Sequence, residues 1–233
     1  MELYLRDVCK TYKGKNAGHD STDSFSMRNV NFDLLPGKVT LVTGCSGSGK
    51  STLLSILCGL LRPESGNVFY GGDSIYDRGG NDLALLRNAK FGIVPQKCLL
   101  MSSLTVRENV MLPALYAGVD EKKAAAKCEE LLSYLGICSL CGRYPRELSG
   151  GEMRRVCIAR AMINEPEYIF ADEPTNDLDE NGKKRVLSLL RESAGQGTGV
   201  LIVSHDSYAV SYADIKYGMN GGMLLQTDFE GLV

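Results

Sequence analysis

The segment GCSGSGKS, residues 44–51, constrains the fold of this 233-residue chain more than any other. It fits the phosphate-binding pattern G-x-x-x-x-G-K-[ST] at every fixed position. The apolar run KVTLVTG leads into it and predicts a strand, and STLLSILCGLL follows and predicts a buried helix. Strand, glycine-rich loop and helix form the context that such a loop requires, so the sequence predicts a P-loop nucleotide-binding core.

The residue types in this loop suit a nucleotide with Mg²⁺. Glycines let backbone N–H groups surround phosphate oxygens, a lysine reaches the β- and γ-phosphates, and the hydroxyl that follows is a Mg²⁺ ligand. The predicted binding residues are Gly44, Cys45, Ser46, Gly47, Ser48, Gly49, Lys50, Ser51 and Thr52. The loop alone leaves kinases, GTPases, helicases and transport ATPases open.

The remaining strand and helix patterns predict an α/β fold. KFGIVPQ, EYIFADE and TGVLIVSHD read as strands, and NGKKRVLSLLRESA, between the last two, reads as a helix. Strands that alternate with helices favour a mainly parallel sheet covered on both faces.

Both ends of the chain have antiparallel character. ELYLRDV and VNFDLL predict strands of an N-terminal antiparallel β portion, joined by the polar loop KGKNAGHDSTDS, and NVFYGGDSIY predicts a hairpin. IKYGMNGGMLLQT predicts a terminal hairpin that turns at Gly221 and Gly222.

The middle of the chain is helical. TVRENVMLPALY, EKKAAAKCEELLSYLG and GEMRRVCIARAMI carry helical periodicity with little strand signal between them. We therefore expect a core formed by residues 1–96 and 166–233, with a helical subdomain, residues 97–165, inserted in it.

Polar residues end three of the predicted strands. Asp172 and Glu173 end one strand, and a carboxylate there can hold Mg²⁺ beside the P-loop while its neighbour orients or polarises the attacking water. Gln96 and His205 end two others. Ligands of open parallel sheets bind beyond the carboxyl ends of the strands, so the four side chains are expected to form one site.

The segment LSGGE, residues 148–152, resembles a second anion-binding helix start. Ser149 is a good N-cap, and the glycines allow a close backbone approach to a ligand. A single phosphate site does not explain why the chain has two such segments.

Composition excludes several classes of protein. The net charge of −2, with basic and acidic residues interspersed, argues against nucleic-acid binding. The apolar runs are shorter than the roughly 20 residues of a membrane span, and no signal-peptide pattern is present, so we expect a cytoplasmic chain.

The eight cysteines are therefore expected to be reduced. Cys138 and Cys141, in CSLC, have metal or redox spacing, but a structural zinc site needs about four ligands, and the only histidines are His19 and His205. Cys45 is predicted to react with maleimide and to be protected by Mg–ATP; the alternative is that it packs against the sheet.

The order of GCSGSGKST, Gln96, LSGGE, YIFADE, TNDLD and His205 resembles the nucleotide-binding subunit of an ABC transporter over nearly the whole chain. The resemblance implies ATP and Mg²⁺ as cofactors and a head-to-tail homodimer. In such a dimer, the residues Ser149, Gly150, Gly151 and Glu152 of one subunit close over the γ-phosphate held by the other subunit. It also implies an integral membrane permease on another chain, and hence a peripheral location on the inner face of the cell membrane.

The same resemblance implies individual roles. Tyr12 stacks on adenine, although a surface tyrosine is the alternative; Gln96 senses Mg²⁺ and couples to the permease; and Glu173 is the general base. Metal ligands are Ser51, Gln96 and Asp172, His205 contacts the γ-phosphate, and Asp179 lies in a loop that crosses the dimer interface.

Within the family, SLTVRENVMLPALY and the overall spacing look most like the branch serving lipoprotein release, macrolide export and antimicrobial-peptide resistance. Glu152 replaces a common glutamine, and Asn176 and Asp177 occupy positions where small residues are common. Two alternatives stay open: an ABC ATPase without a permease, and a cassette that drives a mechanical signal without moving a solute.

Overall fold

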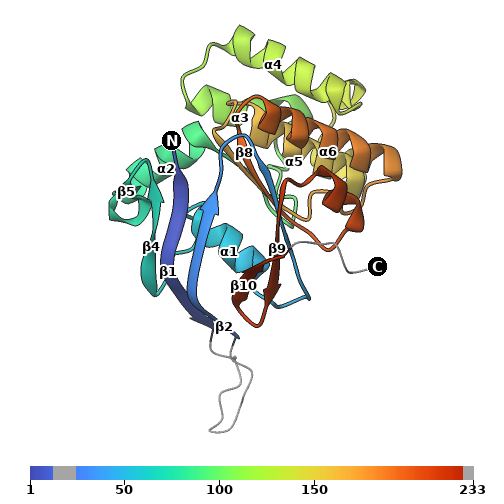
Figure 1. The fold of residues 1–233 in the computed structure, drawn as a ribbon. Coiled ribbons are helices and arrows are strands. Elements are labelled where there is room, and N and C mark those ends of the chain that lie inside the picture. The colour runs from blue at the N-terminus through green and yellow to red at the C-terminus, as the bar shows by residue number, and fades with distance from the viewer. Residues whose placement is uncertain (13–24, 228–233) are drawn as a thin grey trace, which may run out of the picture.

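The structure is a computed structural model that describes residues 1–12 and 25–227. The predicted loop KGKNAGHDSTDS, which contains His19, lies outside the described residues. Figure 1 shows strands at one side of the molecule and helices α3, α4, α5 and α6 gathered at the other.

A six-stranded sheet forms the centre of the fold, in the order β10-β9-β3-β8-β7-β6. Its strands are β3 (Val39–Thr43), β6 (Phe91–Val94), β7 (Tyr168–Asp172), β8 (Gly199–Val203), β9 (Ile215–Asn220) and β10 (Met223–Gln226). All neighbours are parallel except β9 and β10. The predicted mainly parallel sheet and the terminal hairpin, with Gly221 and Gly222 at positive φ in its turn, are both confirmed.

A second, antiparallel sheet has the order β2-β1-β4-β5. It contains β1 (Leu3–Tyr12), β2 (Phe25–Leu34), β4 (Ser65–Tyr70) and β5 (Asp73–Ser74). The predicted N-terminal antiparallel portion is therefore present. The predicted hairpin at residues 67–76 is shorter than its sequence pattern, because a 3₁₀ turn, η1 (Ile75–Asp77), replaces the strand after Ser74.

Six α-helices occur in the described part of the chain: α1 (Lys50–Leu57), α2 (Gly80–Lys90), α3 (Val106–Tyr116), α4 (Glu121–Tyr134), α5 (Gly150–Met162) and α6 (Glu180–Gly195). Further 3₁₀ turns are η2 (Cys138–Leu140), η3 (Pro145–Glu147) and η4 (Ser207–Tyr212). Sequence analysis gives no expectation for α2. It begins without a side-chain cap and buries only Leu86, so its sequence carries little helical signal.

Helices α3, α4 and α5 lie between β6 and β7 in the chain. The division into a core and a subdomain at residues 97–165 stays a prediction. None of the helices in the described segments combines the length and the apolar character needed to cross a membrane.

The parallel strands are buried on both faces, and their side chains alternate between two core clusters. Tyr168 and Phe170 of β7 join α1 and the antiparallel sheet, whereas Ile169 and Ala171 join α3, α4, α5 and α6. Successive strand residues point to opposite faces, so a continuously apolar strand serves both clusters. This two-sided packing fixes the sheet between the layers.

The carboxyl ends of β3, β6, β7 and β8 meet at one edge of this sheet. Val42 and Asp172 both pair with Val203, and Val94 pairs with Ala171. The residues that follow these strands therefore lie side by side, which is where open parallel sheets bind ligands.

Candidate functional site

The glycine-rich loop between β3 and α1 has a conformation that requires its glycines. Gly44, Gly47 and Gly49 have φ values of 149°, 77° and 111°. A Cβ atom at Gly44 would lie 2.2 Å from the carbonyl oxygen of Met219 in β9. The loop can therefore pass this close to the sheet only with glycine at this position.

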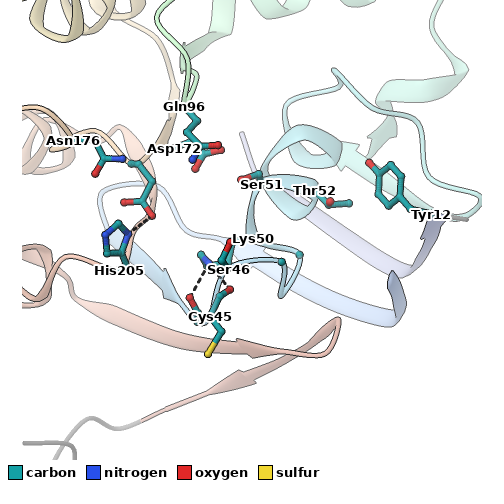
Figure 2. A pocket seen from close by; sticks show the side chains of 14 residues that line it. Tyr12, Cys45, Ser46, Lys50, Ser51, Thr52, Gln96, Asp172, Asn176 and His205 are labelled. Carbon is teal, nitrogen blue, oxygen red and sulfur yellow. Dashed lines mark hydrogen bonds and ion pairs between the residues drawn. The ribbon is translucent and has the colours of Figure 1, made fainter. Parts of the chain in front are cut away.

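A cavity of about 710 Å³ lies at the sheet edge described above. Figure 2 shows the side chains around it, which come from the loop, α1 and the ends of β1, β6, β7 and β8. Its lining residues are Tyr12, Gly44, Cys45, Ser46, Gly47, Gly49, Lys50, Ser51, Thr52, Gln96, Asp172, Glu173, Asn176 and His205. One cavity thus collects most of the residues that the sequence predicts to bind nucleotide or act on it.

Ser48 is the one predicted loop residue that does not line the cavity. Its side chain is buried beneath the loop, and its backbone N–H donates to the carbonyl oxygen of Cys45 at 3.2 Å. The Ser48 side chain therefore packs beneath the loop and does not face the cavity.

Lys50 places a positive charge against the loop. Its Nζ donates to the carbonyl oxygens of Gly44 at 2.8 Å and Cys45 at 3.0 Å, and both contacts are drawn in Figure 2. An ammonium held in this way provides a fixed cationic donor for phosphate oxygens.

Asp172 is a buried carboxylate without a salt bridge to any residue in the described ranges. It is 6% exposed and hydrogen-bonds with the Ser51 side chain. Burial raises the pKa of Asp172, and the hydrogen bond from Ser51 and the charges of Lys50 and Arg154 oppose this effect only in part. A carboxylate in this environment gains from a nearby cation. Together with the Ser51 hydroxyl and the Gln96 amide it gives the oxygen donors that Mg²⁺ prefers.

Glu173 follows Asp172 and is held by two residues after β8. The Ser204 hydroxyl donates to its Oε2 at 2.8 Å, and His205 Nδ1 lies 2.7 Å from its Oε1. Glu173 is 6% exposed and has a φ of 49°, an uncommon backbone conformation that concentrates at functional sites. The carboxylate is therefore fixed at the cavity wall.

Two lining or supporting residues have no role in the sequence prediction. Asn176 lines the cavity, and Ser204 fixes Glu173. Ser204 is the residue between β8 and His205, so its position at a strand end is the one signal that could have found it.

Tyr12 and His205 lie at opposite ends of the cavity (Figure 2). The Tyr12 ring is 43% exposed, and Lys10 Nζ lies 5.9 Å from its centroid. A partly exposed aromatic ring at the cavity rim is suited to stacking on a base, and the adenine role stays a prediction.

The LSGGE segment lies outside the cavity of its own chain, since none of its residues lines it. Ser149 is the N-cap of α5 and forms a capping box: its Oγ accepts from Glu152 N–H at 3.3 Å, and its own N–H donates to Glu152 Oε2 at 2.7 Å. Glutamate and glutamine both form this capping box, so Glu152 in place of the common glutamine leaves the helix start intact. Ser149 and Gly150 are exposed.

The first turn of α5 packs against the TNDLD segment. A Cβ atom at Gly151 would lie 2.6 Å from the carbonyl oxygen of Asp177, whose φ is 63°. Asp179 caps α6 by accepting from the Gly182 N–H at 2.8 Å, and it does not line the cavity. Its interface role stays a prediction.

All eight cysteines are free in the structure. Cys45 is exposed, which excludes the alternative that it packs against the sheet. The Cys138 and Cys141 side chains hydrogen-bond each other. The described residues hold no cluster of three or more His, Cys, Asp and Glu side chains that could hold a metal ion.

Comparisons with known proteins agree with this geometry. Residues 27–176 match the family described as ABC transporter. The lipoprotein-releasing system ATP-binding protein LolD of Buchnera aphidicola subsp. Schizaphis graminum is 38% identical over 200 residues, which cover 85% of this chain and 87% of LolD. The pyoverdine export ATP-binding/permease protein PvdT of Pseudomonas syringae pv. tomato is 38% identical over 221 residues, or 95% of this chain and 33% of PvdT. The chain thus spans about a third of the length of PvdT.

Among solved structures, the dimeric ATP-binding cassette MJ0796 in a post-hydrolysis state, bound to ADP and Pi, superposes with a TM-score of 0.89 at 30% identity. The match covers 99% of this chain and 100% of that one. Family match, relatives and fold agree with the phosphate loop, the strand-end carboxylates and the LSGGE helix. The chain belongs to the ABC transporter family and is an ABC-type ATPase cassette.

Proposed function

We propose that this chain is the ATP-hydrolysing subunit of an ABC transporter. Two copies pair head to tail around two ATP molecules, and the pair drives an integral membrane permease on another chain. The observation that carries the proposal is the separation of the exposed LSGGE helix start from the cavity of its own chain. A second copy can bring that helix start to the γ-phosphate, where backbone N–H groups and the helix dipole favour negative charge.

The reaction follows from the side chains in the cavity. Lys50 binds the β- and γ-phosphates, and the hydrolytic water lies against Glu173, which accepts its proton as general base. The Ser204 hydroxyl and the His205 ring hold the Glu173 carboxylate. The exposed His205 side chain is proposed to contact the γ-phosphate as well. We also propose that the loop containing Asp179 contacts the partner subunit.

Mg²⁺ fits the oxygen donors of three residues that line the cavity. Ser51, Asp172 and Gln96 would hold it, and when bound it neutralises charge that develops on the phosphate oxygens. Gln96 connects this site to the surface, because the chain runs from it directly to the exposed Leu99.

A surface groove of about 280 Å³ is proposed as the permease contact. It lies between α2, β6, α3 and α5 and is lined by Phe91, Ile93, Pro113, Arg160 and Ala161, among others. Arg160 Nη1 donates to the Leu99 carbonyl at 2.7 Å, which places the 70%-exposed Leu99 beside it. The groove also contains the polar residues Arg87, Asn88 and Asn164, and a groove of mixed lining with an exposed apolar residue at its edge fits an amphipathic helix of the partner. LolD, named only as an ATP-binding protein, is matched over 87% of its length, which supports a permease on a separate chain.

Co-purification tests the permease contact. The tagged chain, extracted from membranes in mild detergent, is expected to retain an integral membrane protein, whereas Leu99→Glu loses it and keeps ATPase activity. Leu225→Glu, at a 65%-exposed position on β10 and away from the groove, is the matched control and is expected to retain the partner. Equal retention by both variants would contradict the groove assignment.

Cys45 gives a test of nucleotide position. Its exposed thiol lines the cavity, so we expect maleimide to modify it and inactivate the enzyme, and Mg–ATP to slow the modification by covering the loop. Peptide mapping with and without nucleotide measures this, and the half-buried Cys138, outside the cavity, is the internal control whose labelling ATP leaves unchanged. Labelling that misses Cys45, or that Mg–ATP does not slow, contradicts the assignment.

A further inference from the structure

Arg154, on the LSGGE helix α5, is a buried cation. It is 3% exposed, and it is the only lysine or arginine in the buried class among the residues described. It forms no salt bridge within 4 Å with a carboxylate in the described part of the chain, although its charge acts on the buried Asp172 carboxylate at longer range, and its Nε has no hydrogen-bond partner there. Basic side chains are almost never fully buried unless they are paired.

The Arg154 guanidinium instead holds the backbone of the Gln96 loop, residues 95–99. Nη1 donates to the carbonyl oxygen of Pro95 at 2.7 Å, and Nη2 donates to that of Gln96 at 2.6 Å. These are short, charge-assisted bonds from a planar donor group, which fixes orientation as well as distance. Arg160, six residues further along α5, makes a second attachment, to Leu99.

Burying the charged Arg154 side chain in the core carries a free-energy cost. Burying a charge costs free energy that neutral carbonyl acceptors only partly return, and an apolar side chain of similar volume is often neutral or stabilising at such a site. The attraction between Arg154 and the buried Asp172 carboxylate offsets part of this cost. In addition, the two bonds specify where the Gln96 loop lies relative to α5.

Arg154 connects two functional segments, the Gln96 loop and the LSGGE helix start. Gln96 lines the cavity together with Ser51 and Asp172. Ser149 and Gly150, about one turn before Arg154, are the exposed helix start, which does not line that cavity. The same helix turn also abuts Asp177, so a shift of α5 is transmitted to segments on both sides of the site.

We propose that Arg154 is a positioning residue that couples the two ATP sites of the dimer, and this rests on the head-to-tail dimer proposed above. The ATP that a subunit binds is contacted by its own Gln96. Arg154 transmits the position of the Gln96 loop to α5, whose first turn completes the site of the partner subunit. Occupation of one site then favours closure of the other.

Arg154→Met tests this coupling, because methionine removes both hydrogen bonds and the charge while keeping an unbranched apolar stem. For wild type, two cooperating sites predict a Hill coefficient of about 2 for ATP hydrolysis. For the variant we expect a coefficient of about 1 and a kcat lowered about tenfold, with ATP affinity of the monomer changed less than about twofold. The measurements are hydrolysis at fixed protein concentration and equilibrium ATP binding.

Arg185→Met, on α6, is the matched control, since Arg185 also donates to a backbone carbonyl, that of Tyr134 at 3.1 Å, and its loss leaves both bonds near Gln96. It is expected to keep the wild-type Hill coefficient. Thermal unfolding checks that both variants fold. If Arg154→Met does not fold, Arg154→Lys replaces it; this variant keeps the charge without the planar fork, and a smaller loss, about threefold in kcat, is expected.

Three results would overturn the proposal. An Arg154 variant with wild-type kcat and Hill coefficient would show that the bonds do not couple the sites. Equal loss in Arg185→Met would assign the effect to the general loss of an arginine–carbonyl bond. Absence of hydrolysis in the wild-type chain would remove the proposed function, and this inference with it, which separates that failure from a failure of Arg154 alone.

Discussion

Replacing Glu173 by glutamine is expected to leave ATP binding intact and to slow hydrolysis by about 10²- to 10⁴-fold, the usual contribution of a positioned general base. The amide keeps the size of the side chain and can still accept a hydrogen bond from Ser204, which donates to Oε2 at 2.8 Å. It cannot take a proton from water. The expected signature is a fall in kcat at nearly constant ATP affinity.

Single-turnover hydrolysis and equilibrium ATP binding measure this split. Glu165→Gln is a matched control, because Glu165 has the same φ of 49° as Glu173 but an exposed carboxylate that pairs with Lys127. Its activity is expected to stay within about twofold of wild type, as for a surface ion pair. Activity of Glu173→Gln close to that of wild type would remove the general-base assignment.

Lys50→Ala is expected to abolish hydrolysis and to weaken ATP binding by about 10- to 150-fold, from about 1.5–3 kcal/mol of hydrogen bonding to a charged group. The lysine ammonium lies at the loop, within 2.8 Å of the Gly44 carbonyl, and it is the fixed positive charge that the phosphates meet there. Alanine leaves the glycine backbone in place, so the variant tests the charge itself.

Lys38→Ala provides the matched control, since the exposed Lys38 lies just before β3 and Lys50 lies beyond its other end. Its hydrolysis and ATP affinity are expected to equal those of wild type. Isothermal titration with ATP and a phosphate-release assay measure both variants. Wild-type turnover in Lys50→Ala would overturn the assignment of the phosphate site.

Local sequence patterns were enough to predict the central fold. Strands β3, β7 and β8 are short apolar runs that end in glycine, aspartate or a serine–histidine pair. Their apolar composition and the residues that end them are enough to predict that they are strands. Their common edge then follows from the rule that parallel strands place their carboxyl ends together. Helix α2 could not be predicted in this way, because it packs little apolar surface and its start carries no cap.

Sequence patterns did not predict the residues of the site that act through a partner far away in the chain. Ser204 supports Glu173 across 31 positions of the chain, and Arg154 reaches the Gln96 carbonyl across 58. Neither contact leaves a local pattern, because each depends on how β8 or α5 packs against a neighbouring element. The direction of the Cys45 side chain was equally open, since it depends on the loop conformation that Gly44 and Gly47 allow.

The most direct test of the central claim is the mass of Glu173→Gln measured by light scattering with ATP and with ADP. If the LSGGE helix completes the site of a second copy, the variant becomes a dimer with saturating Mg–ATP and stays a monomer with ADP. Adding Ser149→Arg, which removes the cap and fills the exposed helix start, is expected to restore the monomer in ATP, whereas Ser103→Arg, at another exposed serine, keeps the dimer. A monomer in saturating Mg–ATP, or a dimer that survives Ser149→Arg, would contradict the account.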